Sequence, residues 1–275
     1  MIRKHIRRLA ETMVGPEKTN AIFSAVRQRL ETFRYSYLKI DRMPSQRPSV
    51  NSIYFLVNQL GKHQPVGLTH AAAVGYHELP FAELKFKVSR HDLQDRVARI
   101  RSAISLKGKW GVDIGSALGG LTFALQKEGA QMMGIERDRP SINVSLECEA
   151  LFKTGAKFTH GSVSETLLLE VVKSHHNPSS GHLDFAIWFS SFNWVAQALG
   201  DTATQQFLRT FSKHCDVLLL DSAIGGKGQE FMGTLGIHGN DDFCAYIQRH
   251  TAYTKVESIG KDAHWYDREV FKFSK

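Results

Sequence analysis

The chain has 275 residues, of which 42% are hydrophobic and 23% are charged. This length and composition predict one large domain, or a domain with an appendage, and exclude a disordered, collagen-like or repeat-built chain. The longest apolar runs, 53–57 and 217–220, are far shorter than the ~20 residues that a membrane-spanning helix needs. We therefore expect a soluble chain without a transmembrane segment.

The net charge of +8 is unevenly distributed along the chain. Residues 1–107 hold 19 Lys and Arg against 8 Asp and Glu, a balance of +11, whereas residues 108–275 hold 16 against 19, a balance of −3. A basic segment can bind nucleic acid, an anionic membrane surface or an acidic substrate, or can simply keep a surface solvated. Charge alone does not choose among these alternatives.

Cysteine and histidine spacing argues against a disulfide framework or a metal site. Cys148, Cys215 and Cys244 lie far apart, form no C-x-x-C pair and leave an odd count, which favours a reducing, cytoplasmic location. Three histidines at 175, 176 and 182 surround an N-P-S-S-G segment typical of a surface loop, without the spacing of a helical zinc pair. We expect no bound metal.

The first 107 residues predict a basic, mainly helical N-terminal region. Apolar residues at helical spacing predict a basic amphipathic helix over 1–13, and a second helix is expected over 17–33. Two prolines indicate a loop over 43–49, residues 50–90 follow no regular pattern, and a further helix is expected over 91–105. The helix over 1–13 could pack on its own protein, which we favour, contact a membrane surface or belong to a transit peptide.

From Trp110 onward the pattern changes to strands that alternate with helices, which predicts a doubly wound α/β fold with a parallel sheet. The expected strands are Trp110–Ile114, Gln131–Ile135, Lys157–Thr159, Leu183–Phe189, Val217–Asp221, Thr254–Ser258 and Glu269–Phe273. Helices are expected to begin near Gly119, Pro140, Ser164, Thr202 and Asp241. About ten residues separate the last two strands, too few for a helical crossover, so these should form an antiparallel hairpin.

A glycine-rich turn follows the first of these strands, in the segment D-I-G-S-A-L-G-G of residues 113–120. Gly115 and Gly119 allow a tight turn and a close approach of the backbone to a ligand. Glu136 ends the next strand and has two oxygens that could accept hydrogen bonds from a ribose diol. Asp113 would repel a dinucleotide pyrophosphate, whereas it would attract the ammonium group of S-adenosylmethionine.

These two segments, D-I-G-S-A-L-G-G and G-I-E-R-D, resemble motifs I and II of class I S-adenosylmethionine-dependent methyltransferases. The resemblance covers residues 108–275 and implies a seven-stranded sheet whose last strand is antiparallel, with S-adenosylmethionine as cofactor. Residues 1–107 would then cover the acceptor site. Ala117 departs from the family, in which a middle glycine is common, and it is small enough for the site to survive.

Carried over residue by residue, the resemblance assigns a cofactor site along the carboxyl edge of the sheet. Gly115, Ser116 and Gly119 would line the methionine part of the cofactor, and Asp113 would attract its ammonium group. Glu136 would bind the ribose, and Arg137 would flank the adenine. The turn after the third strand would approach the adenine through Gly161, Ser162 and Val163. Phe189 and Ser190 end the fourth strand, where the family positions the cofactor sulfonium and the acceptor.

The acceptor is less well indicated. The fourth strand lacks the [D/N]-P-P-[Y/F] of amine and amide methylation, the Pro-Cys of cytosine C5 methylation, and the Asp of the ribose 2′-O tetrad. The segment F-S-S-F-N-W-V-A-Q-A-L-G-D is distantly similar to segments of enzymes that methylate terminal phosphates of polysaccharides or RNA. We therefore expect O-methylation of a small-molecule, glycan or other anionic acceptor.

The residues expected around the acceptor come from several segments. Candidate substrate-binding residues are Arg42, Arg47, Asn193, Trp194 and Lys227. His264 is the candidate base for an acceptor that carries a proton. Two alternatives stay open: Phe192 and Trp194 could simply be packing residues, and the basic N-terminal region could instead make the protein an RNA methyltransferase or RNA-binding module.

Overall fold

The computed structural model describes residues 48–62, 78–84, 88, 90–222, 224, 229–262 and 268–275. Residues 44–275 belong to one compact unit, and residues 1–43 belong to another. The helices expected over 1–13 and 17–33 lie outside the described residues.

Seven strands form a single sheet in the order β3-β2-β1-β4-β5-β7-β6. The strands are β1 (Trp110–Ile114), β2 (Gln131–Glu136), β3 (Lys157–His160), β4 (Leu183–Trp188), β5 (Cys215–Asp221), β6 (Lys255–Asp262) and β7 (Arg268–Ser274). Strands β1 to β5 pair in parallel, and β7 pairs antiparallel with both β5 and β6. The predicted α/β fold, its seven strands and the final antiparallel hairpin are confirmed.

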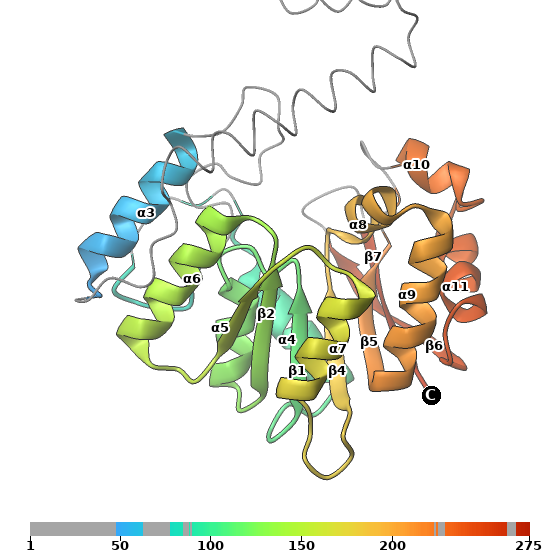
Figure 1. Cartoon of the computed structure of the whole chain (residues 1–275), viewed down its shortest axis with the longest axis horizontal. Coiled ribbons are helices and arrows are strands. Elements are labelled where there is room, and N and C mark those ends of the chain that lie inside the picture. The colour runs from blue at the N-terminus through green and yellow to red at the C-terminus, as the bar shows by residue number, and fades with distance from the viewer. Residues whose placement is uncertain are drawn as a thin grey trace, which may run out of the picture. The chain divides into compact units, whose positions relative to one another are not determined.

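Helices cover both faces of this sheet (Figure 1). They are α3 (Val50–Lys62), α4 (Leu93–Ala103), α5 (Gly120–Lys127), α6 (Arg139–Phe152), α7 (Glu165–Ser174), α8 (Phe192–Leu199), α9 (Asp201–His214), α10 (Gln229–Thr234) and α11 (Asn240–Arg249). Six of them begin within about two residues of the predicted starts, namely α4, α5, α6, α7, α9 and α11. Within the described ranges, none of these helices is long and apolar enough to cross a membrane.

The prediction of an irregular segment over 50–90 is wrong for residues 50–62, which form α3. Ile53, Val57 and Leu60 are buried at the spacing of one helix face. They pack with Val144 and Cys148 of α6, so the segment is helical because α6 offers an apolar surface. A single-sequence pattern does not contain that tertiary contact.

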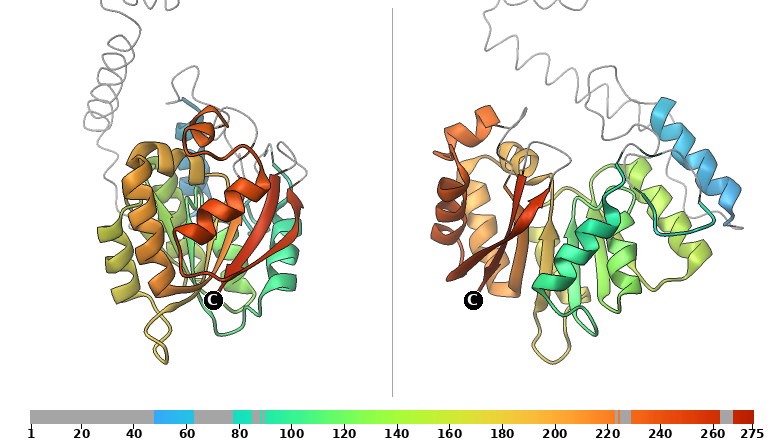
Figure 2. Two further views of the ribbon diagram at one scale, coloured as in Figure 1. Left: turned by 90° about the vertical axis from the view of Figure 1, so that its right-hand side faces the viewer. Right: turned by 180° about the vertical axis from the view of Figure 1, so that it is seen from behind.

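The two faces of the sheet have separate cores. One core joins α7, α8, α9 and α11 to the sheet, and the other joins α4 and α5 to it. Figure 2 shows α4 running across the second face. Leu93, Val97 and Ile100 of α4 are buried against residues of β4 and β5, so α4 packs as part of the unit that contains the sheet. Helix α4 therefore belongs to the same compact unit as the sheet, residues 44–275, and the boundary predicted at 107/108 stays a prediction.

The parallel strands end together at one edge of the sheet. Ile114 of β1 is level with Ile135 of β2, and Trp188 of β4 is level with Leu220 of β5. The C-terminus follows the antiparallel β7 and lies at the lower edge in Figure 1, so the carboxyl ends of β1 to β5 lie at the upper edge. Open α/β sheets bind their ligands at this carboxyl edge.

Candidate active site

The glycine-rich turn between β1 and α5 depends on its glycines. Gly115 has φ 78° and Gly119 has φ 80°, both in the left-handed region. A Cβ on Gly115 would lie 2.7 Å from Ser191 Oγ, and one on Gly119 would lie 2.7 Å from a ring carbon of Phe158. Ala117 also has a positive φ, 50°, so three residues of this turn lie in the left-handed region.

Backbone hydrogen bonds attach this turn to the end of β2. The N–H groups of Gly115 and Ser116 both donate to the carbonyl oxygen of Ile135, at 2.9 and 3.1 Å. The N–H of Gly119 donates to the Ser116 carbonyl at 2.8 Å, which closes the turn on itself. Gly115 stays exposed while its neighbours on β1 are buried, so a ligand can reach the backbone at this point.

Glu136 holds the same turn through its side chain. Its Oε2 accepts the N–H of Ala117 at 2.9 Å, and its Oε1 accepts the N–H of Asp138 at 2.7 Å. A carboxylate has about four lone-pair sites, so each oxygen keeps capacity for one further donor. Burial raises the pKa of Glu136 above its ordinary value, and the two backbone donors act in the opposite direction. Glu136 can thus anchor the turn and still accept two hydroxyl groups.

Asp113 is the second acid at this edge, and it is buried, with 5% of its surface exposed. Thr122 of α5 donates its hydroxyl to Asp113 Oδ2 at 2.7 Å. Burial raises the pKa of Asp113, whereas the Thr122 hydrogen bond and the nearby positive charge of Arg96 lower it. Arg96 is itself buried on α4, with its guanidinium 4.9 Å from the ring centre of Phe189.

The residues assigned to the adenine side lie beside Glu136. The N–H of Gly161 donates to the Glu136 carbonyl oxygen at 3.0 Å, which fixes the turn after β3 next to the end of β2. Arg137 and Ser162 are exposed, and Val163 is half-buried.

Ser116, assigned to the methionine side of the turn, is 7% exposed, and its hydroxyl has no hydrogen-bond partner within the part of the chain that the structure describes.

The end of β4 is fixed to its neighbours on both sides. Ser191 donates its hydroxyl to the carbonyl oxygen of Ile114 at 3.2 Å, so this turn contacts the end of β1. Ser190 has φ 61° and donates its N–H to Asp221 Oδ1, at the end of β5, at 2.7 Å. Phe189 is buried, with 7% exposed. Ser190 is thus held in a backbone conformation that few non-glycine residues adopt.

The three residues of the first turn of α8 that bear on the acceptor differ in their exposure to solvent. Phe192 is fully buried in the core, as the packing alternative expected. Asn193 is 3% exposed, and its Oδ1 has no hydrogen-bond partner among the described atoms. Trp194 is 39% exposed, so it is a surface residue rather than a packing residue.

Four of the predicted site residues lie outside the described ranges, namely His264, Arg42, Arg47 and Lys227. In the ranges that are described, no cluster of three or more His, Cys, Asp or Glu could hold a metal ion. His175 is 2% exposed and hydrogen-bonded to two backbone carbonyl oxygens, so the expectation that it belongs to a surface loop is wrong.

Three charged residues of this edge were missed from the sequence: Arg96, Asp221 and Arg268. For Arg96 a signal existed, since it lies beside the apolar positions of a predicted helix. For Asp221 the signal was an acid that ends a buried strand, as Asp113 does. No local pattern distinguishes Arg268, which comes 47 residues after Asp221 yet lies 3.4 Å from it.

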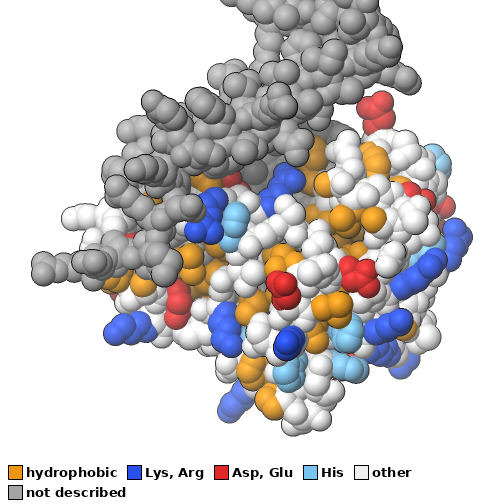
Figure 3. Space-filling view, in the orientation of Figure 1, with side chains coloured by type: hydrophobic (Ala, Val, Ile, Leu, Met, Phe, Trp, Pro, Cys, Tyr) orange, Lys and Arg blue, Asp and Glu red, His pale blue; other side chains and the backbone are white. Residues whose placement is uncertain are grey.

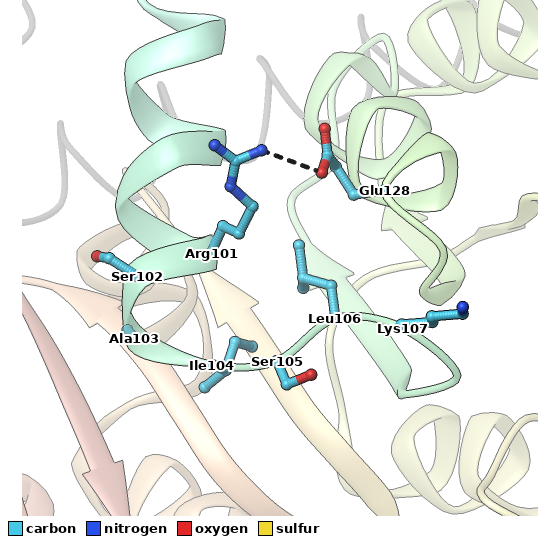
Figure 4. A pocket seen from close by; sticks show the side chains of 8 residues that line it. All are labelled: Arg101, Ser102, Ala103, Ile104, Ser105, Leu106, Lys107 and Glu128. Atoms are coloured by element: carbon cyan, nitrogen blue, oxygen red, sulfur yellow. Dashed lines mark hydrogen bonds and ion pairs between the residues drawn. The ribbon is translucent and has the colours of Figure 1, made fainter.

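A surface cavity of about 480 Å³ lies away from these residues, and it is lined by residues 101–107 and Glu128 (Figure 4). Its lining runs from the last turn of α4 to the segment before β1, so it belongs to the amino edge of the sheet. Arg101 forms an ion pair with Glu128 across it at 3.4 Å. Nothing in this cavity bears on the glycine-rich turn.

Strand order and comparison define the class of fold. No protein-family model and no curated protein sequence matches the chain. Solved structures do match, and the order 3-2-1-4-5-7-6 with an antiparallel β7 is that of the class I methyltransferase fold. The chain has this fold.

One matching structure is the bifunctional kinase–methyltransferase WbdD, at 20% identity and a TM-score of 0.57. The match covers 79% of this chain and 46% of WbdD, so the chain spans about half the length of that protein. Magnesium protoporphyrin IX methyltransferase (ChlM) from Synechocystis PCC 6803, crystallised with bound SAH, matches at 13% identity and a TM-score of 0.46. That match covers 66% of this chain and 81% of ChlM.

Proposed function

We propose that the chain is an S-adenosylmethionine-dependent methyltransferase that binds its cofactor at the carboxyl edge of β1 and β2. The observation that carries the proposal is a buried acid, Asp113, and a half-buried acid, Glu136, on either side of a turn in which Gly115 is exposed. Titratable groups with displaced pKa values at the ligand edge of such a sheet are typical of functional sites.

The acids fit this cofactor better than a dinucleotide. Asp113 can accept a hydrogen bond from the methionine ammonium, while Arg96 beside it offers a positive charge for the methionine carboxylate. Glu136 has lone-pair capacity for the two ribose hydroxyls. A pyrophosphate at the same turn would meet the negative charge of Asp113. The two carboxylates and the arginine therefore favour a ligand that carries an ammonium and a carboxylate at one end and a diol in its middle.

The other assigned residues would line the remainder of the ligand. Gly115, Ser116 and Gly119 would contact the methionine part through backbone and hydroxyl groups. The adenine would be flanked by Arg137 and the turn formed by Gly161, Ser162 and Val163. The bound cofactor supplies an electrophilic methyl group on sulfur, and Phe189 and Ser190 would shape the wall at which that methyl meets the acceptor.

The acceptor proposal is an oxygen of a small-molecule, glycan or other anionic compound. Asn193 and Trp194 follow the end of β4 and could contact it, with Arg42, Arg47 and Lys227 as further candidates. An oxyanion acceptor is already ionised and needs no strong base, whereas a hydroxyl acceptor would use His264. Exposed Trp194 offers an apolar face, which suits a sugar or another ring.

The alternative of RNA as substrate or partner rests on the basic N-terminal region, most of which lies outside the described residues. On the face drawn in Figure 3, Lys and Arg side chains are interspersed with acidic ones rather than gathered. Retention on RNA or heparin over a salt series distinguishes the two acceptor classes, because binding through phosphates weakens steeply with salt.

Titration calorimetry of the full chain tests the cofactor proposal directly. We expect micromolar binding of S-adenosylmethionine or its demethylated product, and no comparable heat with a nicotinamide dinucleotide. Heat with the dinucleotide and none with S-adenosylmethionine would refute the proposal.

Replacing Glu136 with alanine should weaken S-adenosylmethionine binding about ten- to a hundredfold. The variant loses charge-assisted hydrogen bonds to the ribose, worth roughly 1.5–3 kcal/mol, and also the anchor on the Ala117 N–H. Calorimetry on the variant measures the affinity, and circular dichroism establishes that the protein is folded.

Glu149→Ala is a matched control for this prediction. Glu149 also accepts a local backbone N–H, from Gly155 at 2.8 Å, but it lies near the C-terminal end of α6 rather than at the ligand edge. The control should retain full affinity. If Glu136→Ala loses its thermal transition while the affinity of the folded fraction is unchanged, then Glu136 is only structural.

A further inference from the structure

A second buried charged cluster lies at the carboxyl edge, at the end of β5, two strands away from β1 and its glycine turn. Asp221, at the end of β5, is 1% exposed. Its Oδ1 accepts the N–H of Ser190 at 2.7 Å, and its Oδ2 accepts the Ser190 hydroxyl at 3.2 Å. Arg268, the first residue of β7, reaches Oδ2 with one guanidinium nitrogen at 3.4 Å.

Arg268 has more hydrogen-bond capacity than this cluster uses. A guanidinium carries five N–H donors on three nitrogens, in a fork that matches an oxyanion. Among the residues that the structure describes, Asp221 is the one side-chain partner of Arg268, through a long contact, and the buried Nε atom has no partner there. The side chain is 13% exposed, so part of it remains accessible. Buried donors without partners are uncommon in proteins and call for an explanation.

The position of the cluster connects it to the reaction site. Ser190 joins Asp221 on one side, and its neighbour Ser191 joins the end of β1 on the other. Ser191 also limits the space above Gly115. Because β7 runs antiparallel to β5, its first residue lies at the carboxyl edge. Arg268 is therefore at the same edge as the glycine turn, displaced from it toward the acceptor side of β4.

Asp221 and Arg268 also differ in what they can do. Asp221 has both oxygens engaged and is sealed from solvent, so its role is to fix Ser190 and the guanidinium. Arg268 keeps donors that no described residue uses, and 13% of its side chain is exposed. A carboxylate that orients an arginine in this way leaves the rest of the fork available for a second oxyanion, and charge-assisted bonds of this kind are strong where water is largely excluded.

We propose that Arg268, oriented by Asp221, binds an oxyanion of the methyl acceptor, such as a phosphate or carboxylate group. This proposal rests on the proposed methyltransferase function for the identity of the ligand as an acceptor. It assigns the anion-binding role to β7, in the described part of the unit, rather than to the basic segment before residue 48.

The test uses the full chain saturated with S-adenosylhomocysteine, titrated with inorganic phosphate at constant ionic strength set by chloride. Sodium acetate in a parallel series distinguishes a carboxylate site from a phosphate site. The wild type should show a saturable rise in melting temperature with one of the two anions. Arg268→Gln should show none, and Arg268→Lys should bind the anion at least about tenfold more weakly, because lysine keeps the charge without the fork.

Arg101→Gln is the matched control, since Arg101 also makes a single ion pair at 3.4 Å but lies at the opposite edge and is 62% exposed. It should respond to the anion as the wild type does. Arg268→Lys keeps a positive charge beside Asp221. If Arg268→Gln does not fold, the anion affinity of Arg268→Lys is compared with that of the wild type instead.

The proposal is overturned if the wild type shows no saturable response, if Arg268→Lys matches the wild type, or if Arg101→Gln loses the response equally. Binding of S-adenosylhomocysteine is measured separately on each protein before the anion is added. An anion response that depends on Arg268 in a chain without S-adenosylhomocysteine binding would reject the methyltransferase proposal and leave the anion site standing. The reverse result rejects the anion site alone.

Discussion

Gly111→Ala should destabilise the folded chain by about 3 kcal/mol, near the upper end of the usual cost of overpacking a core. Gly111 lies within β1, and a Cβ there would come 2.3, 2.6 and 2.7 Å from three ring carbons of Phe185 on β4. Phe185 is 1% exposed, so its ring has no free space into which it could move. Denaturant unfolding, compared through the transition midpoint, measures the effect.

A second substitution separates overpacking from a general effect on the strand. Phe185→Leu removes the ring atoms that the new Cβ would meet, so the double variant should recover at least half of the loss. Gly108→Ala provides the other control, because Gly108 has φ 73° but nothing within 4 Å of the position that a Cβ would take. It should cost only the strain of a left-handed alanine, roughly 1 kcal/mol. Equal losses in Gly108→Ala and Gly111→Ala would contradict the packing explanation.

The strands were predictable because each is a short buried run bounded by turn residues. Strands β1, β4 and β5 are buried on both faces, so their sequences are almost continuously apolar, which is a strong local signal. Helix α3 was missed although Ile53, Val57 and Leu60 have the spacing of one helix face; that this face is buried depends on α6, nearly 90 residues later in the chain. Helix α8 was expected only in the alternative in which Phe192 and Trp194 are packing residues that begin a helix, since its first turn closely follows the end of β4 in the sequence.

The cofactor side of the site could be predicted further than the acceptor side. Asp113, the glycine turn and Glu136 are adjacent to strand ends, so their proximity follows from the parallel sheet. The second function of Glu136, as an acceptor for the Ala117 N–H, depends on the exact path of the turn and could not be predicted. The contact of Asp221 with Arg268 requires β7 to insert between β5 and β6, which no local pattern encodes.

Protonation of His175 should make the fold sensitive to mild acid. His175 follows α7 and is 2% exposed. Its Nε2 lies 3.1 Å from the carbonyl oxygens of Gly111 and Gln131, so this nitrogen donates, while the buried Nδ1 has no partner among the described residues. Burial lowers the pKa of His175 from 6.5 to about 4. The unfolded chain therefore takes up a proton at a pH where the folded chain does not.

The direction of the effect follows from this difference. Above pH 6.5 the ring is neutral in both states, and the full stability is present. As the pH falls from 6.5 to about 4, the unfolded state gains the proton first, and stability is lost. Below about 4 the contribution of this group no longer changes. A pKa difference of this size corresponds to about 3 kcal/mol at most.

The free energy of unfolding, measured at pH 7.5 and pH 4.5 for the wild type and for His175→Gln, tests this expectation. Glutamine can still donate to the two carbonyl oxygens, but it does not titrate, so the variant should lose about 2–3 kcal/mol less than the wild type on acidification. Carboxyl groups also titrate on acidification and affect the wild type and the variant alike, so their contribution cancels in the comparison. Asp184 is one of them: partial burial raises its pKa, but hydrogen bonds from Trp110, Lys109 and Asn177 lower it by more. His91→Gln, which replaces a ring that is 69% exposed, should behave as the wild type.

An acid response in His175→Gln equal to that of the wild type would contradict the expectation. It would mean that the buried ring is protonated in the folded state or that another group controls acid unfolding.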